Sequence, residues 1–137
     1  MRFLLLFLFF LPGIALADDA LAPSAWENQS GSMLYLDAVD AEGRFTGRYV
    51  NGAAGYRCQG IEYPVEGQVF DPLISFRVVW IAEAETCHTI TSWTGQISGD
   101  VIETEWSLVR WAEPDGDVPG ADGFARYTGT SRFERRH

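Results

Sequence analysis

Three tryptophans, Trp80, Trp93 and Trp106, recur at intervals of thirteen residues in a chain of 137 residues. Indole rings bring a large apolar area and lose little rotamer entropy when they are fixed, which suits the walls of a small-molecule site. Each tryptophan lies in or ends a short segment of alternating residues bounded by turn residues. The pattern therefore predicts rings carried on several adjacent strands around one pocket, with plain core packing as the alternative for each ring.

The segments that would carry these rings repeat with a period of two, which is typical of β-strands with one buried face. The expected strands are 25–28, 33–39, 45–51, 63–69, 76–80, 89–98, 101–109 and 125–133. Tight turns are expected at 40–43, 71–72 and 99–100, and longer loops at 52–61, 81–88 and 112–123. No stretch has a helical period of useful length.

Eight short strands joined in sequence close most simply into a barrel, which leaves no strand edge exposed. A barrel of eight strands is wide enough to hold one small ligand. An immunoglobulin-like sandwich is the alternative fold, but its cysteines lie on strands, whereas Cys58 and Cys87 fall in expected loops. We therefore expect an all-β fold, an eight-stranded antiparallel up-and-down β-barrel.

The N-terminal segment has the layout of a secretory signal peptide. One arginine precedes an apolar run at 3–11, and Ala15 and Ala17 provide the small residues before a cleavage site. The apolar run is too short to cross a bilayer. We expect residues 1–17 to be removed and residues 18–137 to form one domain that is secreted or periplasmic.

The composition argues against several classes of partner. The chain has nineteen acidic residues against ten arginines and no lysine, for a net charge of −9. Nucleic acid and membrane surfaces are therefore not expected as partners. Two cysteines and two scattered histidines offer no four-ligand zinc site, so no metal or cofactor is expected. In an exported chain Cys58 and Cys87 are expected to pair as a disulfide.

Four separated motifs carry a resemblance to a known family. They contain Trp26, Asn28, Gln29, Gly31 and Ser32; Phe45, Thr46, Gly47 and Tyr49; Trp80, Thr89, Thr91, Trp93, Thr94, Gly95 and Gln96; and Trp106 and Leu108. Together they strongly resemble the avidin and streptavidin family of biotin-binding proteins. The dimeric, rhizavidin-like branch of that family shares further residues with this chain, namely Tyr49, Val50, Asn51, Cys58, Gln59, Tyr63, Pro64 and Cys87.

The resemblance implies how the polar residues would serve the ureido group of biotin. Asn28, Ser32 and Tyr49 would donate hydrogen bonds to the ureido oxygen, and such bonds are strong in a dry pocket. Asn51 and Ser131 would accept from the two ureido N–H groups. Other members have Asp or Asn at the position of Ser131, and losing a charged acceptor should weaken binding by about 1–2 kcal/mol.

The resemblance also implies which residues would contact the rest of biotin. Thr91 would contact the thioether sulfur, while Thr89, with backbone amides near Ala53 and Gly55, would hold the valerate carboxylate. The fused rings would be enclosed by Trp80, Trp93, Trp106 and Leu108. A disulfide between the two loops near the tail would preorganise them and slow ligand escape; a role in stability alone is the alternative.

A second departure from the family pattern concerns the oligomeric state. Tetrameric members lend a tryptophan from a neighbouring subunit to the pocket, from the segment before the last strand. The corresponding segment here, 112–124, contains no tryptophan, and Gly123 and Phe124 stand at the nearest positions. The resemblance therefore implies a pocket that is complete within one subunit, in a homodimer.

Rival functions are weaker. Glu103 and Glu105 fall on the strand face opposite Trp106, and His88 stands alone in an expected loop, so an enzyme is not expected. A lipocalin-like carrier of another small ligand is the main alternative, and an avidin-fold scaffold with weakened biotin affinity is another because of Ser131. The expected function is high-affinity non-covalent binding of biotin, with sequestration of biotin as its purpose.

Overall fold

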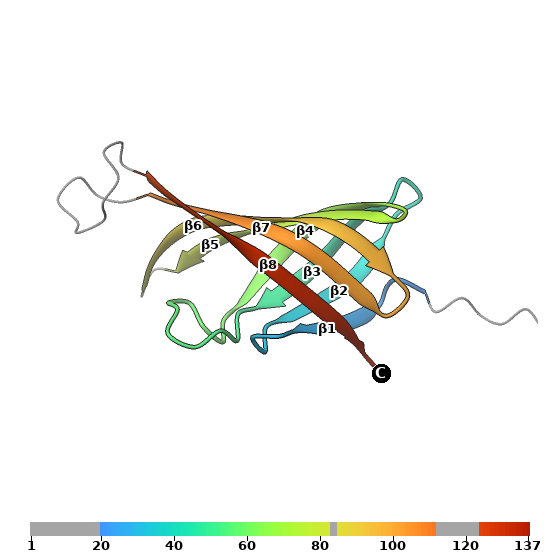
Figure 1. Ribbon diagram of the computed structural model, residues 1–137, viewed down its shortest axis with the longest axis horizontal. Helices are drawn as coiled ribbons and strands as arrows, with labels where there is room; N and C mark the ends of the chain where they lie inside the picture. The colour runs from blue at the N-terminus through green and yellow to red at the C-terminus, as the bar shows by residue number, and fades with distance from the viewer. Residues whose placement is uncertain (1–19, 83–84, 112–123) are drawn as a thin grey trace, which may run out of the picture.

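The computed structural model describes residues 20–82, 85–111 and 124–137. Eight strands follow one another along the chain (Figure 1): β1 Ser24–Asn28, β2 Met33–Val39, β3 Arg44–Val50, β4 Glu62–Phe70, β5 Leu73–Ala82, β6 Glu85–Ser98, β7 Val101–Trp111 and β8 Phe124–Arg136. The expected signal peptide at 1–17 and the expected loop at 112–123 lie outside the described residues.

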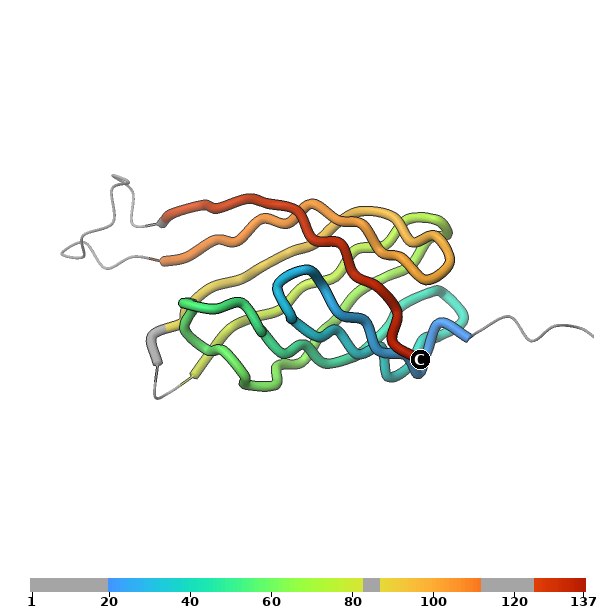
Figure 2. Tube along the Cα trace, turned by 60° about the horizontal axis from the view of Figure 1, so that its bottom comes forward, coloured from blue at the N-terminus to red at the C-terminus, as the bar shows by residue number. Residues whose placement is uncertain are grey.

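The strands form a closed barrel in which each strand pairs antiparallel with the next in sequence. Closure comes from the pairing of β1 with β8, in which Trp26 lies opposite Arg135. Figures 1 and 2 show β8, in red, running between β7 in orange and β1 in blue. The predicted eight-stranded up-and-down barrel is confirmed, and the sandwich alternative is wrong because a sandwich has two separate sheets, whereas these eight strands pair in one closed ring.

The alternation of the sequence sets the inside and the outside of the barrel. Along β5, Ile74, Phe76, Val78 and Trp80 are buried and the residues between them are exposed. Burying one face of each strand in this way removes apolar side chains from water, which is the main stabilising term. The fully buried end of the barrel contains Trp26, Leu34, Leu36, Ile74, Ile102 and Phe133.

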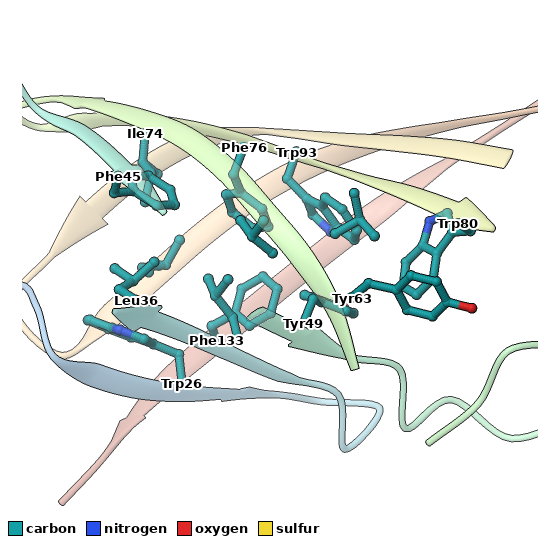
Figure 3. Packing of buried hydrophobic residues seen from close by; sticks show 14 of the residues in the cluster. Trp26, Leu36, Phe45, Tyr49, Tyr63, Ile74, Phe76, Trp80, Trp93 and Phe133 are labelled. Carbon is teal, nitrogen blue, oxygen red and sulfur yellow. The ribbon is translucent and has the colours of Figure 1, made fainter. Parts of the chain in front are cut away.

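Aromatic rings fill the barrel in layers along its axis (Figure 3). Phe76 stacks on Trp93 with ring centroids 4.9 Å apart and planes 12° from parallel. The ring centroid of Tyr49 is 5.0 Å from that of Trp93. Phe133 lies on the Trp26 side of Tyr49, with a centroid distance of 6.4 Å. Trp26 and Phe133 therefore belong to the packed end of the barrel, and Tyr49 and Trp93 mark where the packing gives way to the cavity.

One predicted loop is wrong. Residues 81–88 were expected to be a loop carrying Cys87, but β5 continues to Ala82 and β6 begins at Glu85. Ala82 pairs with Glu85 after an irregularity in register. The segment contains no Gly, Pro, Asn or Asp, so nothing in it favours a loop over continuation of the ladder. Cys87 therefore lies on a strand.

The predicted disulfide is confirmed. Cys58 and Cys87 are bonded, with their Cα atoms 6.5 Å apart. Cys58 lies in the connection between β3 and β4 and has a positive φ of 59°, and both cysteines are buried. The bond joins this connection to the start of β6, so it ties a loop to the barrel wall rather than one loop to another.

Candidate ligand-binding site

A cavity of about 1040 Å³ is lined by Trp80, which lies toward the end of the barrel opposite Trp26 (Figure 3). Its volume matches a site for one small molecule. The sequence-predicted site residues all line it: Asn28, Ser32, Tyr49, Asn51, Ala53, Trp80, Thr89, Thr91, Trp93, Trp106, Leu108 and Ser131. They come from six strands and two connections, so only the closed barrel brings them together.

Asn28 ends β1 and is fixed by the turn that follows it. Its side-chain Oδ1 accepts hydrogen bonds from the backbone N–H of Ser30 at 3.0 Å and of Ser32 at 2.9 Å. Asparagine favours this kind of turn because its short amide can replace a backbone acceptor. With Oδ1 engaged, the Nδ2 amide group is the part of Asn28 that can donate to a ligand.

Ser32 and Asn51 form the next part of the wall. The Ser32 hydroxyl accepts the Gly52 N–H at 3.0 Å and donates to Asn51 Oδ1 at 3.3 Å. Asn51 Oδ1 also accepts the Ala53 N–H at 3.0 Å. Gly52 is required here because a Cβ at that position would overlap the backbone of Gly31. The sequence predicted Asn51 as an acceptor for ligand but not that its oxygen is already engaged.

Tyr49 lies on β3 with its phenol facing the cavity region. Burial raises the pKa of the Tyr49 phenol to about 12, and a hydrogen bond with Ser32 acts in the opposite direction. Burial disfavours the phenolate because the charge would lose its hydration. Tyr49 therefore stays a neutral hydrogen-bond donor to a higher pH than an ordinary tyrosine.

Trp80 and Thr91 face each other from paired strands. The Trp80 Nε1–H donates to Thr91 Oγ1 at 2.9 Å in a buried hydrogen bond. This bond uses the hydroxyl as an acceptor, so the hydroxyl proton of Thr91 is left to point elsewhere. The Trp80 ring also packs edge-on against Tyr63, with centroids 4.9 Å apart. The indole is thus locked in position as a wall.

Trp106 lies opposite Trp93 on β7 and covers the backbone of β8. Gly129 is its partner on β8, and a Cβ at that position would overlap the Trp106 ring. The glycine lets the indole lie flat on the strand, where a side chain would push it into the cavity. Trp93 and Trp106 therefore bound the cavity from adjacent strands.

Ser131 is buried on β8, opposite Thr104. The Thr104 hydroxyl donates to the Ser131 backbone oxygen at 3.2 Å, so this contact leaves the Ser131 hydroxyl uncommitted. Because β8 is in register with β7 through the whole ladder, Ser131 lies on the inner face, as the alternation predicted.

The mouth of the cavity includes Thr89, Ala53 and Gly55, as expected. Sequence reasoning missed several other residues there: Tyr56, Arg57, Arg110, Arg126 and Tyr127. Arg110 could have been found, since it is two residues beyond Leu108 and shares its face. The place of Arg126 at the mouth depends on how β7 and β8 pair, which the sequence does not reveal.

Groups that could suggest catalysis lie outside the cavity. Glu103 and Glu105 are exposed, and Glu103 pairs with Arg132 at 2.6 Å. His88 is also exposed. Among the described residues, no group of three or more His, Cys, Asp and Glu side chains is placed to hold a metal ion. The same residues include no helix long and apolar enough to cross a membrane.

Comparison with known proteins identifies the family. The model of the Avidin family matches residues 18–127. Afifavidin from Afifella pfennigii is 38% identical over 74% of this chain, which spans 66% of afifavidin. A shwanavidin variant solved with biotin is 41% identical, with a TM-score of 0.69 over 84% of this chain and 96% of that one.

The rhizavidin–biotin complex is also similar, at 36% identity and a TM-score of 0.71 over 85% of this chain and 92% of that one. The resemblance noted in the sequence is thus confirmed by the family match, by afifavidin and by two solved structures. The closed barrel, the cavity at one end and the disulfide agree with that match. This chain belongs to the avidin family.

Proposed function

We propose that this protein binds biotin non-covalently in the barrel cavity and that it catalyses no reaction on it. The observation that carries the proposal is the convergence of Asn28, Ser32 and Tyr49 on one end of a buried, tryptophan-walled cavity. Similar proteins, a shwanavidin variant and rhizavidin, have been solved in complex with biotin.

The three polar groups suit a ureido oxygen. This oxygen carries partial negative charge and accepts several hydrogen bonds at once. Asn28 offers its amide N–H because its oxygen is held by the turn, and Tyr49 offers its phenol, which is protonated at neutral pH as in any tyrosine. Donors already fixed by the protein lose little entropy on binding, which favours tight association.

Ser32 links the ureido oxygen to the acceptor on Asn51. The hydroxyl has a single proton, which it donates to Asn51 Oδ1 at the long distance of 3.3 Å. If that proton turns to the ureido oxygen, Asn51 Oδ1 is freed to accept a ureido N–H. Ser131 supplies the second acceptor on the opposite wall, through an uncharged hydroxyl.

The remaining lining fits the rest of biotin. Trp80, Trp93 and Trp106 enclose the fused rings, and Leu108 completes this wall. The Thr91 hydroxyl can donate to the thioether sulfur because it accepts from Trp80. Thr89 and the loop near Ala53 would receive the carboxylate at the mouth. A lipocalin-like carrier would instead have few converging polar groups in its cavity.

Isothermal titration calorimetry of the purified protein with biotin tests the proposal. We expect saturable heat at one biotin per chain, and the expected high affinity should give a sharp equivalence point. Absence of heat at saturating biotin would contradict biotin binding. Desthiobiotin keeps the ureido group and lacks the sulfur, so it serves as a control that should bind more weakly.

The proposal includes export, with residues 1–17 as a cleaved signal peptide and 18–137 as the mature domain, secreted or periplasmic. The start of the family match at residue 18 supports this division. Sequestration of biotin outside the cytoplasm is the proposed purpose.

The proposal also includes a homodimer. The outer faces of β5, β6 and β7 carry a row of cross-strand neighbours, Val79, Ile90 and Val109. Val79 and Ile90 are exposed, as are Ile81 and Trp111 at the same end. Contiguous exposed apolar surface of this kind favours association.

A further inference from the structure

The described charged residues that line the cavity have a charge opposite to the net charge of the protein. The chain has a net charge of −9, yet the described residues lining the cavity include Arg57, Arg110 and Arg126 and no acidic residue. Among the described residues, the charged side chains that line the cavity are therefore all positive.

Most other arginines of the described chain are neutralised by carboxylates. Arg44, Arg48, Arg77, Arg132 and Arg136 each lie within 4.0 Å of an Asp or Glu oxygen. Within the described residues, Arg110 makes no ion pair or hydrogen bond through its side chain. A guanidinium is always charged and forms strong hydrogen bonds to carboxylates. Among the described residues, no carboxylate therefore competes with an incoming anion for the Arg110 guanidinium.

The register places Arg110 beside a proposed ligand contact. Thr89 on β6 pairs directly with Arg110 on β7, and directly paired residues have Cβ atoms about 4.5–5.5 Å apart. Both are half-buried and both line the cavity. Thr89 is the hydroxyl proposed to hold the valerate carboxylate, so the guanidinium lies next to the expected position of that carboxylate.

We infer that Arg110 determines specificity for the charge on the ligand's tail, so that the site prefers a free carboxylate to a neutral amide at the same position. This inference rests on the proposed function. Thr89 and the loop amides would favour the acid as well, but they are neutral. Arg110 adds the contribution that depends on charge, and that contribution is screened by salt.

The test compares biotin with biotinamide, which has the same rings and an uncharged tail. Dissociation constants are measured for the unaltered protein, for Arg110→Gln and for Arg77→Gln, which removes an equal charge from the outer face of β5. We expect Arg110→Gln to lower the preference for biotin over biotinamide by about fivefold, as for a partly exposed charge pair. Arg77→Gln should leave that preference unchanged.

The outcomes separate the two proposals. If the unaltered protein binds neither compound, the proposed function fails. If it binds biotin but Arg110→Gln keeps the full preference, or weakens both compounds equally, the inference about Arg110 is overturned. Arg110→Lys keeps the charge and should retain part of the preference, and about 1 M salt should reduce the preference of the unaltered protein.

Discussion

At the scale of single residues, the site is a hydrogen-bond network that the backbone holds in place before any ligand arrives. Backbone N–H groups fix the acceptor atoms of Asn28, Ser32 and Asn51. Fixing these atoms leaves defined donors facing the cavity. Such preorganisation reduces the entropy lost on binding and mainly slows dissociation.

Ser131 is the residue at which a substitution should improve binding. Ser131→Asp would place a carboxylate opposite the ureido N–H, and charged acceptors form stronger hydrogen bonds. We expect biotin to dissociate about tenfold more slowly, in line with a gain of about 1–2 kcal/mol. Stopped-flow or displacement kinetics would measure this. Ser131→Ala is the control and should speed release, and an unchanged rate in both variants would show that Ser131 does not contact the ligand.

Tyr49 predicts a simple pH dependence. Its pKa is raised from 10 to about 12, so the phenol should stay a donor at pH values where an ordinary tyrosine ionises. Because the folded pKa lies above the unfolded one, its contribution to stability is constant below about pH 10 and is lost as the pH rises toward about 12. The contribution of the Tyr49 phenol to biotin affinity should therefore stay constant from about pH 7 to about pH 10.

Comparison with Tyr49→Phe isolates that part. The variant keeps the ring contacts with Trp80 and Trp93 and loses only the donor. Its affinity should be lower by about tenfold, by the same factor at each pH in this range. A factor that shrinks toward one between neutral pH and about pH 9 would mean that the phenol ionises early, which contradicts a pKa raised by burial.

At the scale of elements, paired strands decide where the rings can lie. Trp106 covers Gly129 on the neighbouring strand, and Phe45 covers Gly67 in the same way at the packed end of the barrel. Each glycine leaves room for a ring that a larger residue would displace. The two pairs serve opposite ends of the barrel, and a Cβ at Gly67 would also meet the backbone oxygen of Ser75 at 2.5 Å.

This similarity provides a matched pair of substitutions. Gly129→Ala should push the Trp106 ring into the cavity and weaken biotin binding, with a smaller loss of stability. Gly67→Ala should cost about 1–3 kcal/mol of stability through overpacking at Phe45 and leave the rate of biotin release unchanged. Thermal unfolding and dissociation kinetics measure the two effects, and equal effects of both variants on release would contradict the assignment of Trp106 to the site.

The disulfide joins the connection after β3 to the start of β6 at the mouth of the cavity. Reduction should free this connection, which contains Ala53, and speed biotin release while the barrel stays folded, because the closed ladder does not depend on the bond. Release would be timed with and without reductant, with circular dichroism as the check on folding. A rate that reduction does not change would assign the bond to stability alone.

The elements were largely predictable because an alternating pattern leaves little freedom in a closed barrel. Tyr49, Thr91 and Leu108 could be assigned to the inside from their period alone. Cys87 was misplaced because the alternation around it is weak, although the segment also lacks the turn residues that a loop would favour. The engaged oxygen of Asn51 and the mouth position of Arg126 could not be foreseen, since they depend on contacts between distant strands.

At the scale of the whole molecule, the barrel separates stability from binding along its axis. Trp26, Phe76 and Phe133 are packed at one end, and the ligand cavity occupies the other. Closure through β1 and β8 also removes the exposed strand edges that would invite aggregation. Substitutions at the mouth can therefore change binding without unfolding the protein.

The apolar patch on the outer face of β5, β6 and β7 predicts that the protein is a dimer. If Val79, Ile90 and Val109 form a dimer interface, Ile90→Arg should yield monomers, because burying an unpaired charge is costly. Gln96 lies on the same outer face of β6. Gln96→Arg is therefore the control, and it should leave the dimer intact. Analytical ultracentrifugation would distinguish the two masses. A monomeric unaltered protein, or a dimer unaffected by Ile90→Arg, would exclude this interface.

The most direct test of biotin binding in the barrel is a crystal structure of the protein grown with excess biotin. We expect the bicyclic rings between Trp80, Trp93 and Trp106, with the ureido oxygen within about 3.2 Å of donors on Asn28, Ser32 and Tyr49. An empty cavity, or biotin bound with its ureido group at the mouth and away from these three residues, would contradict the proposed site.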